Sequence, residues 1–175
     1  VVLVMNQRHA QFSSLEDQAR TQALTGAAAA SMMLESALDT GALTRDQLFD
    51  TNYQEIPGTS PKQYHTAFDA FTDKEVRAFE DSFLHDRDVT FAAMVDRNGY
   101  LPTHNTKFSV AGSGTATDRS KRIFNDPVGL AAAQNTKEAS LLQTYKRDTG
   151  ERLWDVSAPI MVHGEHWGAM RVGYS

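Results

Sequence analysis

The hydrophobic period of this chain changes once, at Arg87, and that change limits the folds open to it. Before Arg87, apolar residues recur at spacings near three and four, which is the period of an amphipathic helix. After Arg87 the spacing becomes two, and turn residues separate short runs rich in β-branched and aromatic side chains. A run of helices followed by a run of strands predicts an α+β fold. With 175 residues, the chain is long enough for one domain and short for two.

The first half is expected to contain one long helix and two shorter ones. Residues 6–38 hold no proline and one glycine, and a continuous helix over them would be about 50 Å long, so we expect it to project as a stalk. Two predicted capping boxes, Thr44 with Gln47 and Thr72 with Glu75, would each start a shorter helix. The apolar positions of the long helix are Phe12, Leu15, Ala19, Leu24, Ala27, Met33, Leu34 and Leu38.

The second half is predicted to form five strands, arranged as a hairpin and a three-stranded antiparallel meander. Asn98-Gly99 is the strongest turn signal, because both central positions of a type I′ turn need positive φ. The span 105–139 is too long for a structureless loop, so we expect a helical insert there. The strands are expected at residues 89–96, 100–104, 140–148, 151–162 and 165–174.

Charge and composition exclude several classes of function. The chain has 17 Lys and Arg against 22 Asp and Glu, a net charge of -5, and no basic run longer than two, so nucleic-acid binding is not expected. There is no cysteine, which excludes disulfides, thiol catalysis and covalent c-type haem attachment. No nucleophile elbow, phosphate loop or HExxH motif is present, so an enzyme is not expected and no catalytic residue is assigned.

The chain opens on five apolar residues, VVLVM, with no charged leader. Two interpretations stay open. These residues are either the stub of a transmembrane helix or an apolar first turn packed on the core. No stretch of 18 or more apolar residues occurs, so the sequence as given contains no spanning segment.

Several motifs resemble the sensor region of bacterial methyl-accepting chemotaxis proteins and related transmembrane transducers. They are DRNGYLPTHN, SKRIFND, LLQTYKRDTGE, DVSAPI and GEHWG, in that order, preceded by YQEIPGTSPKQYHTAFDAF. The predicted order of elements is likewise similar to a single Cache domain, an extracytoplasmic PAS-like sensor module. The resemblance implies a long N-terminal helix and short helices packed on a five-stranded antiparallel PAS-like sheet.

The resemblance also implies how the domain is organised and where it lies. One sensor domain would cover residues 1–175, with the long helix at 1–40, a helical lead-in at 41–87 and the sheet at 88–175. A transmembrane helix would precede Val1 and another would follow Ser175, which places the domain in the periplasm as part of an inner-membrane protein. In the full-length receptor it would form a homodimer. Some relatives attach haem through CxxCH, which this sequence lacks, and no cofactor is expected.

In a Cache domain the ligand pocket lies between the sheet and the insert, and an anionic ligand there needs donors from both. The predicted ligand-binding residues are His104, Lys121, Arg122, Tyr145, Arg147 and Trp167. For the arginines, the alternative is an internal ion pair with Asp126, Asp148 or Asp155. For His104, the alternative is a ring that donates to the backbone of the insert and anchors it.

Other conspicuous residues are expected to have structural roles. His163-Gly164-Glu165-His166 resembles a metal-ligand cluster, but neighbouring strand residues point to opposite faces, so no metal site is predicted. Tyr100 is expected to be a core aromatic, Trp154 is expected to be a packing residue, and Trp167 either packs or walls the pocket. Pro159 indicates an edge, or a bulge if its strand is central.

The sequence therefore predicts a periplasmic sensor domain of a transmembrane chemoreceptor. It would bind a small molecule, expected to be a short organic acid such as acetate, and pass a helix displacement across the membrane. The alternative is a structural, dimerisation or protein-interaction domain whose pocket is filled by its own side chains. A noncovalent haem held by His104 also stays open.

Overall fold

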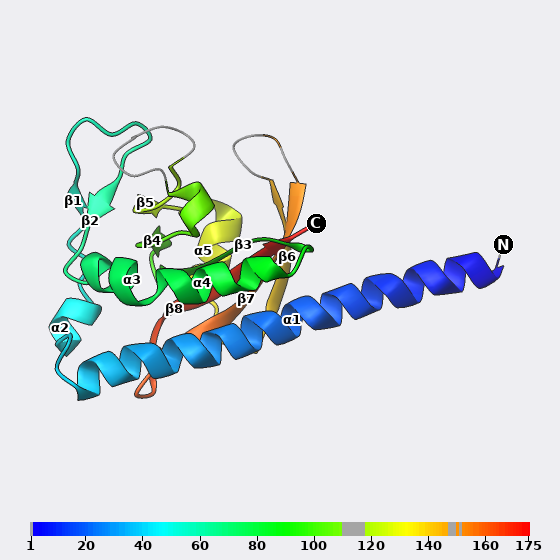
Figure 1. The fold of residues 1–175 in the computed structure, drawn as a ribbon, viewed down its shortest axis with the longest axis horizontal. Coiled ribbons are helices and arrows are strands. Elements are labelled where there is room, and N and C mark those ends of the chain that lie inside the picture. The colour runs from blue at the N-terminus through cyan, green and yellow to red at the C-terminus, as the bar shows by residue number, and fades with distance from the viewer. Residues whose placement is uncertain (1, 110–117, 147–149, 151) are drawn as a thin grey trace.

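The computed structural model has an α+β architecture in which one long helix crosses a face of an antiparallel sheet (Figure 1). It describes residues 2–109, 118–146, 150 and 152–175, with side chains from Ser14 onward except that of Tyr145. Helix α1, Val2–Asp39, continues past the sheet as the predicted stalk. Within the described residues, no helix is long and apolar enough to cross a membrane.

The main sheet has four strands and not the five that were predicted. All neighbours are antiparallel, and the spatial order is β3 (Val89–Asp96), β8 (Glu165–Tyr174), β7 (Arg152–Val162) and β6 (Leu141–Lys146). Two short ribbons lie outside it: β1 (Gln54–Glu55) with β2 (Tyr64–His65), and β4 (Tyr100–Leu101) with β5 (Arg122–Ile123). The predicted hairpin partner, 100–104, is therefore a two-residue strand that pairs with the insert.

Side chains occupy the edge of β3 where the fifth strand was expected. The backbone N–H of Ala92 donates to Asn105 Oδ1 at 2.9 Å, and that of Met94 donates to Glu80 Oε2 at 2.9 Å. These two acceptors satisfy buried donors that would otherwise need a neighbouring strand. The strand β4 is therefore not needed at this edge.

The turn after β3 also differs from the predicted type I′ geometry. Gly99 has φ +84°, but the only non-glycine residues with positive φ among those described are Lys121 and His163, so Asn98 does not. Instead, Asp96 Oδ1 accepts the backbone N–H of Asn98 at 2.9 Å and that of Tyr100 at 3.0 Å. This carboxylate closes the turn and directs β4 away from β3.

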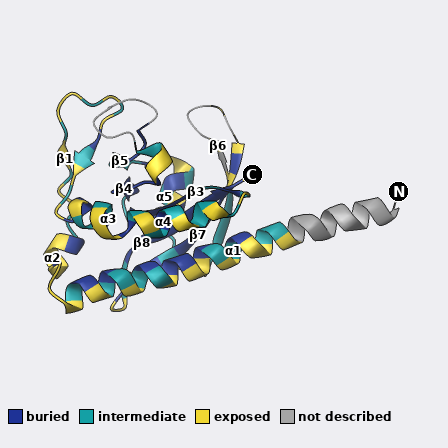
Figure 2. Ribbon diagram, viewed as in Figure 1, coloured by how far each residue is buried: buried dark blue, intermediate teal, exposed yellow. Residues whose placement is uncertain are grey.

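Helix α1 packs on the sheet through small side chains. Figure 2 shows a buried stripe along the side of α1 that faces β7 and β8. A side chain at Gly26 would meet Phe83 at 2.9 Å and Met170 of β8 at 3.1 Å, so the helix backbone lies close to the sheet. Leu24, which belongs to the predicted apolar positions of the long helix, is 42% exposed and does not join this stripe. The buried stripe consists of Ala19, Ala23, Ala27, Ala30, Leu34 and Ala37.

The short helices agree with the prediction in part. The Thr44–Gln47 capping box is confirmed at the start of α2, Arg45–Leu48. The Thr72–Glu75 capping box is wrong, because α3 begins earlier and Thr72 lies inside it, with its hydroxyl 2.9 Å from that of Thr103. The remaining elements are α3 (Asp69–Glu75), α4 (Arg77–Ser82), the 3-10 turns η1 (Phe83–His85) and η2 (Thr106–Phe108), and α5 (Pro127–Gln134) in the insert.

Pro159 lies in a central strand at a point where that strand has one paired neighbour. Strand β6 pairs with residues 152–157 of β7, so at Pro159 only β8 is opposite. A register shift follows between Ile160 and Met161, which leaves Trp167 of β8 as an extra residue. The missing neighbour and the nearby bulge each allow a proline, which has no backbone N–H to donate. The prediction of an edge or a bulge at Pro159 therefore agrees with the structure.

The buried carboxyl of Glu80 should give the protein a measurable pH dependence. Burial raises the pKa of Glu80 well above its usual range. An acid whose pKa is raised in the folded state favours folding most when it is protonated. This contribution to the unfolding free energy is fully present below the unfolded pKa, about 4.3, and is lost as pH rises through the folded pKa. We expect Glu80→Gln, which keeps an oxygen for Met94 N–H, to remove this loss of stability between pH 5 and 8.

The measurement is urea unfolding across that pH range for the wild type, Glu80→Gln and Glu80→Leu. Glu80→Leu leaves the Met94 N–H unpaired and should cost about 1–3 kcal/mol of unfolding free energy. An identical pH slope in the wild type and Glu80→Gln would contradict a protonated, buried Glu80.

Candidate functional site

The strand register places two cross-strand rows of side chains on the sheet face opposite α1, here called the insert face. Directly paired residues share a face of an antiparallel sheet. The first row is Phe91, Gly173, Asp155 and Gln143, and the second is Ala93, Arg171, Ser157 and Leu141. The intervening residues, Ala92, Val172, Val156 and Leu142, belong to the core on the α1 side.

The insert covers this face. Helix α5 contacts β6, β7 and β8, and the Nε2 of Gln143 donates to the carbonyl of Val128 at 3.0 Å. Apolar side chains of the insert and sheet form one cluster, consisting of Ala93, Val95, Leu101, Phe124, Ala133 and Ala169. The expected roof over the sheet is thus present in residues 105–109 and 118–139, while 110–117 lie outside the described residues.

An ion pair is buried in the middle of the insert face. Arg171 Nε donates to Asp155 Oδ2 at 3.0 Å, and Nη2 lies 2.8 Å from the same oxygen. The two side chains are 3% and 0% exposed. Burial raises the pKa of Asp155, and the neighbouring guanidinium opposes this rise. Asp155 is therefore the internal acid of Arg171, a pairing that the sequence analysis had considered only for Arg122 and Arg147.

Three buried polar atoms, two on the insert face and one at the β3 edge, have no hydrogen-bond partner among the described residues. They are Asp155 Oδ1, Ser157 Oγ and Asn105 Nδ2. Burying such groups without a partner costs free energy, so their presence together indicates a site that a ligand could complete. Ser157 is paired with Arg171 across the strands, and a hydroxyl opposite a guanidinium is a donor that suits a small carboxylate.

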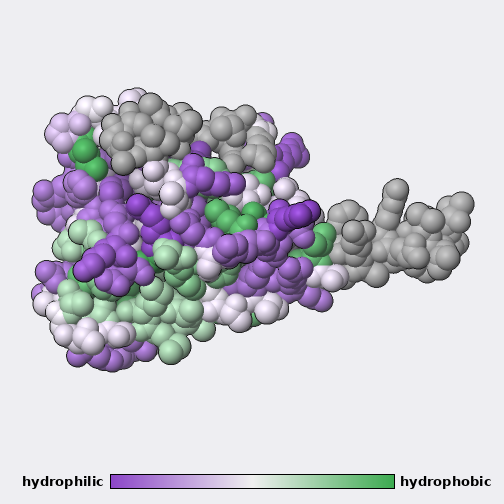
Figure 3. Space-filling model, in the orientation of Figure 1, coloured by the Kyte–Doolittle hydropathy of each residue, from purple (hydrophilic) through white to green (hydrophobic). Residues whose placement is uncertain are grey.

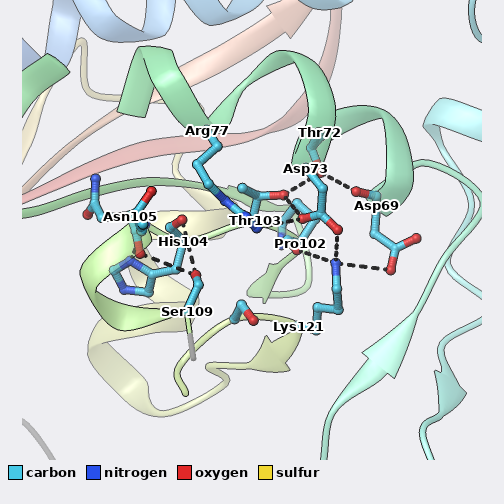
Figure 4. Close-up of polar contacts among 12 residues, drawn as sticks. Asp69, Thr72, Asp73, Arg77, Pro102, Thr103, His104, Asn105, Ser109 and Lys121 are labelled. Atoms are coloured by element: carbon cyan, nitrogen blue, oxygen red, sulfur yellow. Dashed lines mark hydrogen bonds and ion pairs between the residues drawn. The ribbon is translucent and has the colours of Figure 1, made fainter. Parts of the chain in front are cut away.

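His104 lies beside this site. Its ring packs against Phe91 at 5.9 Å and Phe108 at 4.9 Å between centroids, and Phe91 lies 6.0 Å from the Arg171 guanidinium. Its Nδ1 accepts a hydrogen bond from the backbone N–H of Asn105 at 2.7 Å. The sequence analysis had considered the reverse direction, in which the ring donates to the backbone of the insert. In Figure 4 the ring lies near Ser109, whose hydroxyl donates to the His104 carbonyl at 3.2 Å.

Lys121 points away from the insert face. Figure 4 shows its Nζ between two carboxylates of α3, 2.6 Å from Asp73 Oδ2 and 3.3 Å from Asp69 Oδ2, with the Pro102 carbonyl at 3.1 Å. Asp73 also accepts from Thr103. These contacts fasten the insert to α3. An anion at Lys121 would have to displace two carboxylates.

Of the other four predicted ligand contacts, the structure describes the side chains of Arg122 and Trp167, and these two lie apart. The Arg122 guanidinium lies over the Phe124 ring, 4.8 Å from its centroid, and is half-buried. Trp167 is fully buried on the α1 side, where its Nε1 donates to the Leu48 carbonyl at 2.9 Å. The extra residue in β8 turns it to that side, so it does not wall the insert face. The Tyr145 side chain and Arg147 lie outside the described residues.

The residues of the His163–His166 motif turn in different directions. His163 Nε2 lies 3.0 Å from Asp39 Oδ1, Glu165 pairs with Arg45, and His166 Nε2 donates to the Gly168 carbonyl at 2.9 Å. Each polar group thus has its own partner. No set of three candidate metal ligands occurs among the residues that the structure describes.

The sequence analysis missed Arg171 and Ser157 as site residues, and it considered Asp155 only as a partner of Arg122 or Arg147. The signal was present, because Arg171 is the one charged residue between Trp167 and Tyr174, in a strand of apolar residues and glycines. A lone arginine in such a strand must be buried with a partner. Its partner comes from the neighbouring strand, which no local pattern could identify.

Comparison with known proteins gives no family. No family model and no curated protein matches this chain. Among solved structures, it is similar to the Vibrio cholerae histidine kinase DctB sensor domain (12% identity, TM-score 0.46) and the extracellular domain of the putative histidine kinase rpHK1S-Z16 (12%, 0.44). It is also similar to an extracellular ligand binding receptor from Desulfohalobium retbaense (15%, 0.38).

These similarities extend over most of this chain but only part of the other structures. They cover 94%, 94% and 90% of this chain, and 57%, 58% and 25% of the respective structures. At TM-scores below 0.5 they assign neither family nor ligand, so the function has to be argued from the site itself.

The buried ion pair should respond differently to single and double substitution. Arg171→Met leaves Asp155 buried without its cation, which should lower the unfolding free energy by about 3–5 kcal/mol. The double variant Arg171→Met, Asp155→Leu replaces both charges by apolar groups and should recover most of that loss.

Urea unfolding tests this expectation. The exposed Arg152→Gln serves as control and should stay within about 0.5 kcal/mol of the wild type. A double variant no more stable than Arg171→Met would show that the pair is not the dominant interaction at this position.

Proposed function

We propose that this chain is a periplasmic ligand-binding sensor domain of a transmembrane chemoreceptor, anchored in the inner membrane. The observation that carries the proposal is the buried Arg171, whose cross-strand row also holds Ser157 and lies under the insert. The resemblance of the sequence motifs to Cache sensors gives independent support. A single sensor domain over residues 1–175 is part of the proposal.

The ligand proposed for this site is a short organic acid such as acetate. Its carboxylate would share the Arg171 guanidinium with Asp155 and accept from Ser157 Oγ and Asn105 Nδ2, two groups that have no partner among the described residues. Phe91, Ala93 and Ala169 supply the apolar surroundings for a short alkyl group. His104, whose ring packs against Phe91, is kept in this proposal as a ligand-binding residue.

The strand that carries Arg171 also contacts the helix that would transmit the signal. Met170 and Val172 alternate with Arg171 and lie in the core on the α1 side, and Met170 lies close to Gly26. A displacement of β8 on ligand binding would therefore press directly on α1. A ligand that binds one position of β8 more tightly than another would shift the helix population accordingly.

The homodimer belongs to the same proposal. Figure 3 shows an apolar area along the part of α1 that leads to α2. On this helix Leu24 is 42% and Met32 is 71% exposed. Large apolar side chains exposed on a helix are suited to packing against a second copy, through which a helix displacement could pass to the output.

A thermal-shift assay with short organic acids tests the proposed ligand class. A ligand at about 100 times its Kd adds about 2.7 kcal/mol, which in a chain of this size raises the Tm by about 5–10 °C. We expect acetate or another short acid to do this, and acetamide, a neutral molecule of the same shape, to have no effect.

The variants separate ligand binding from folding. Arg152→Gln should respond to the acid like the wild type. The folded double variant Arg171→Met, Asp155→Leu should not respond. If no short acid stabilises the wild type, or if the double variant responds as well, the site is not a carboxylate sensor and the alternative of a structural or interaction domain gains support.

A further inference from the structure

A second site lies at the end of the molecule away from both termini. A cleft of about 700 Å³ opens between α2, the loop that follows it, the turn after β3 and the β7–β8 turn. In Figure 1, α2 and this end of the sheet lie opposite the ends marked N and C. The lining residues are Arg45, Asp46, Phe49, Asp50, Thr51, Asn52, Arg97, Glu165 and His166.

One wall of the cleft presents a guanidinium that is available to an anion. Arg97 makes no ion pair with any described residue, and its guanidinium lies 5.7 Å from the centroid of the Phe49 ring. The adjacent Asp96 cannot serve as its partner without losing other bonds, since it accepts from Tyr53 and from two backbone N–H groups. The backbone N–H of Arg97 donates to the Trp167 carbonyl at 2.8 Å, which fixes the turn.

The cleft is also lined by two carboxylates, Asp46 and Asp50. Asp46, on α2, is exposed and makes no ion pair within the described part of the chain. Asp50 holds the loop, with its oxygens accepting the backbone N–H of Asn52 at 2.9 Å and of Ala67 at 2.8 Å. The remaining pair of charges, Arg45 and Glu165, neutralise each other.

His166 adds a neutral acceptor. Because its Nε2 donates to the Gly168 carbonyl at 2.9 Å, its Nδ1 carries a lone pair when the ring is neutral. Burial lowers the pKa of His166 against the opposing effect of the Gly168 hydrogen bond, and Arg97 acts in the same direction as burial, which favours the neutral ring. The cleft therefore offers one cation, two anions and an acceptor for an N–H group.

We propose that this cleft binds the zwitterionic ends of an amino acid or short peptide. The carboxylate would bind Arg97 and the ammonium would face Asp46 and Asp50. A simple anion would be repelled by the two carboxylates, and a simple cation would be repelled by Arg97, so only a ligand with both charges matches the charges that line the cleft. The open volume is sufficient for a peptide of a few residues.

Amide chemical-shift titration tests the proposal with defined probes. Triglycine and glycine are compared with N-acetyltriglycine, which lacks the ammonium, and with triglycine amide, which lacks the carboxylate. We expect triglycine or glycine to shift the amides of residues 45–52, 97 and 165–166. The two blocked peptides should bind about tenfold or more weakly. Tighter binding of glycine would identify an amino-acid site, and tighter binding of triglycine a peptide site.

Matched variants assign the roles. Arg97→Gln should weaken triglycine binding about tenfold or more, and Asp46→Asn should weaken it without weakening the binding of N-acetyltriglycine. Arg152→Gln, at the other end of β7, is the control for loss of a surface arginine and should bind normally. The Arg171→Met, Asp155→Leu variant should also bind normally, because it alters only the insert face.

Three results would overturn the proposal: equal binding of the blocked and free peptides, no effect of Arg97→Gln, or shifts confined to residues outside the cleft. None of them bears on the organic-acid site, which is tested by acetate and Arg171.

Discussion

The buried pair of Arg171 and Asp155 determines what the insert face of the sheet can do. A guanidinium with 3% exposure needs a negative partner, and in this structure a neighbouring strand supplies it. Strand alternation then has a second consequence, since each residue beside Arg171 on β8 faces the core under α1. The same strand thus carries a polar group toward the insert and apolar groups toward the helix. The proposed sensing depends on this division.

The rest of the fold keeps that face covered and its edge closed. Asn105 and Glu80 accept the N–H groups of β3 that a fifth strand would have accepted. Because β4 is released from this edge, it pairs with Arg122–Ile123 and draws the insert over the sheet. Lys121, between Asp69 and Asp73, holds the insert against α3. The polar residues of the hairpin exit and insert therefore build the roof, even where they touch no ligand.

Local patterns predicted the elements well and the side-chain partners poorly. The long helix, the insert with its short α5, and the bounds of β3 and β8 followed from periodicity and turn residues. The fifth strand failed because an Asn-Gly turn signal cannot reveal that Asp96 closes the turn differently. Trp167 faces the core because of an irregular register that only pairing shows. Arg171 and Asp155 come from different strands, so their meeting depends on register and not on spacing along the chain.

The most direct test of the account is where a bound acid lies in the folded protein. Acetate labelled with ¹³C in its methyl group, mixed with the protein, should give intermolecular nuclear Overhauser effects to the methyl groups of Ala93 and Ala169 on the insert face. Effects only to residues of the α1 side, such as Ala92 or Val172, would place the ligand elsewhere and contradict the proposed role of Arg171.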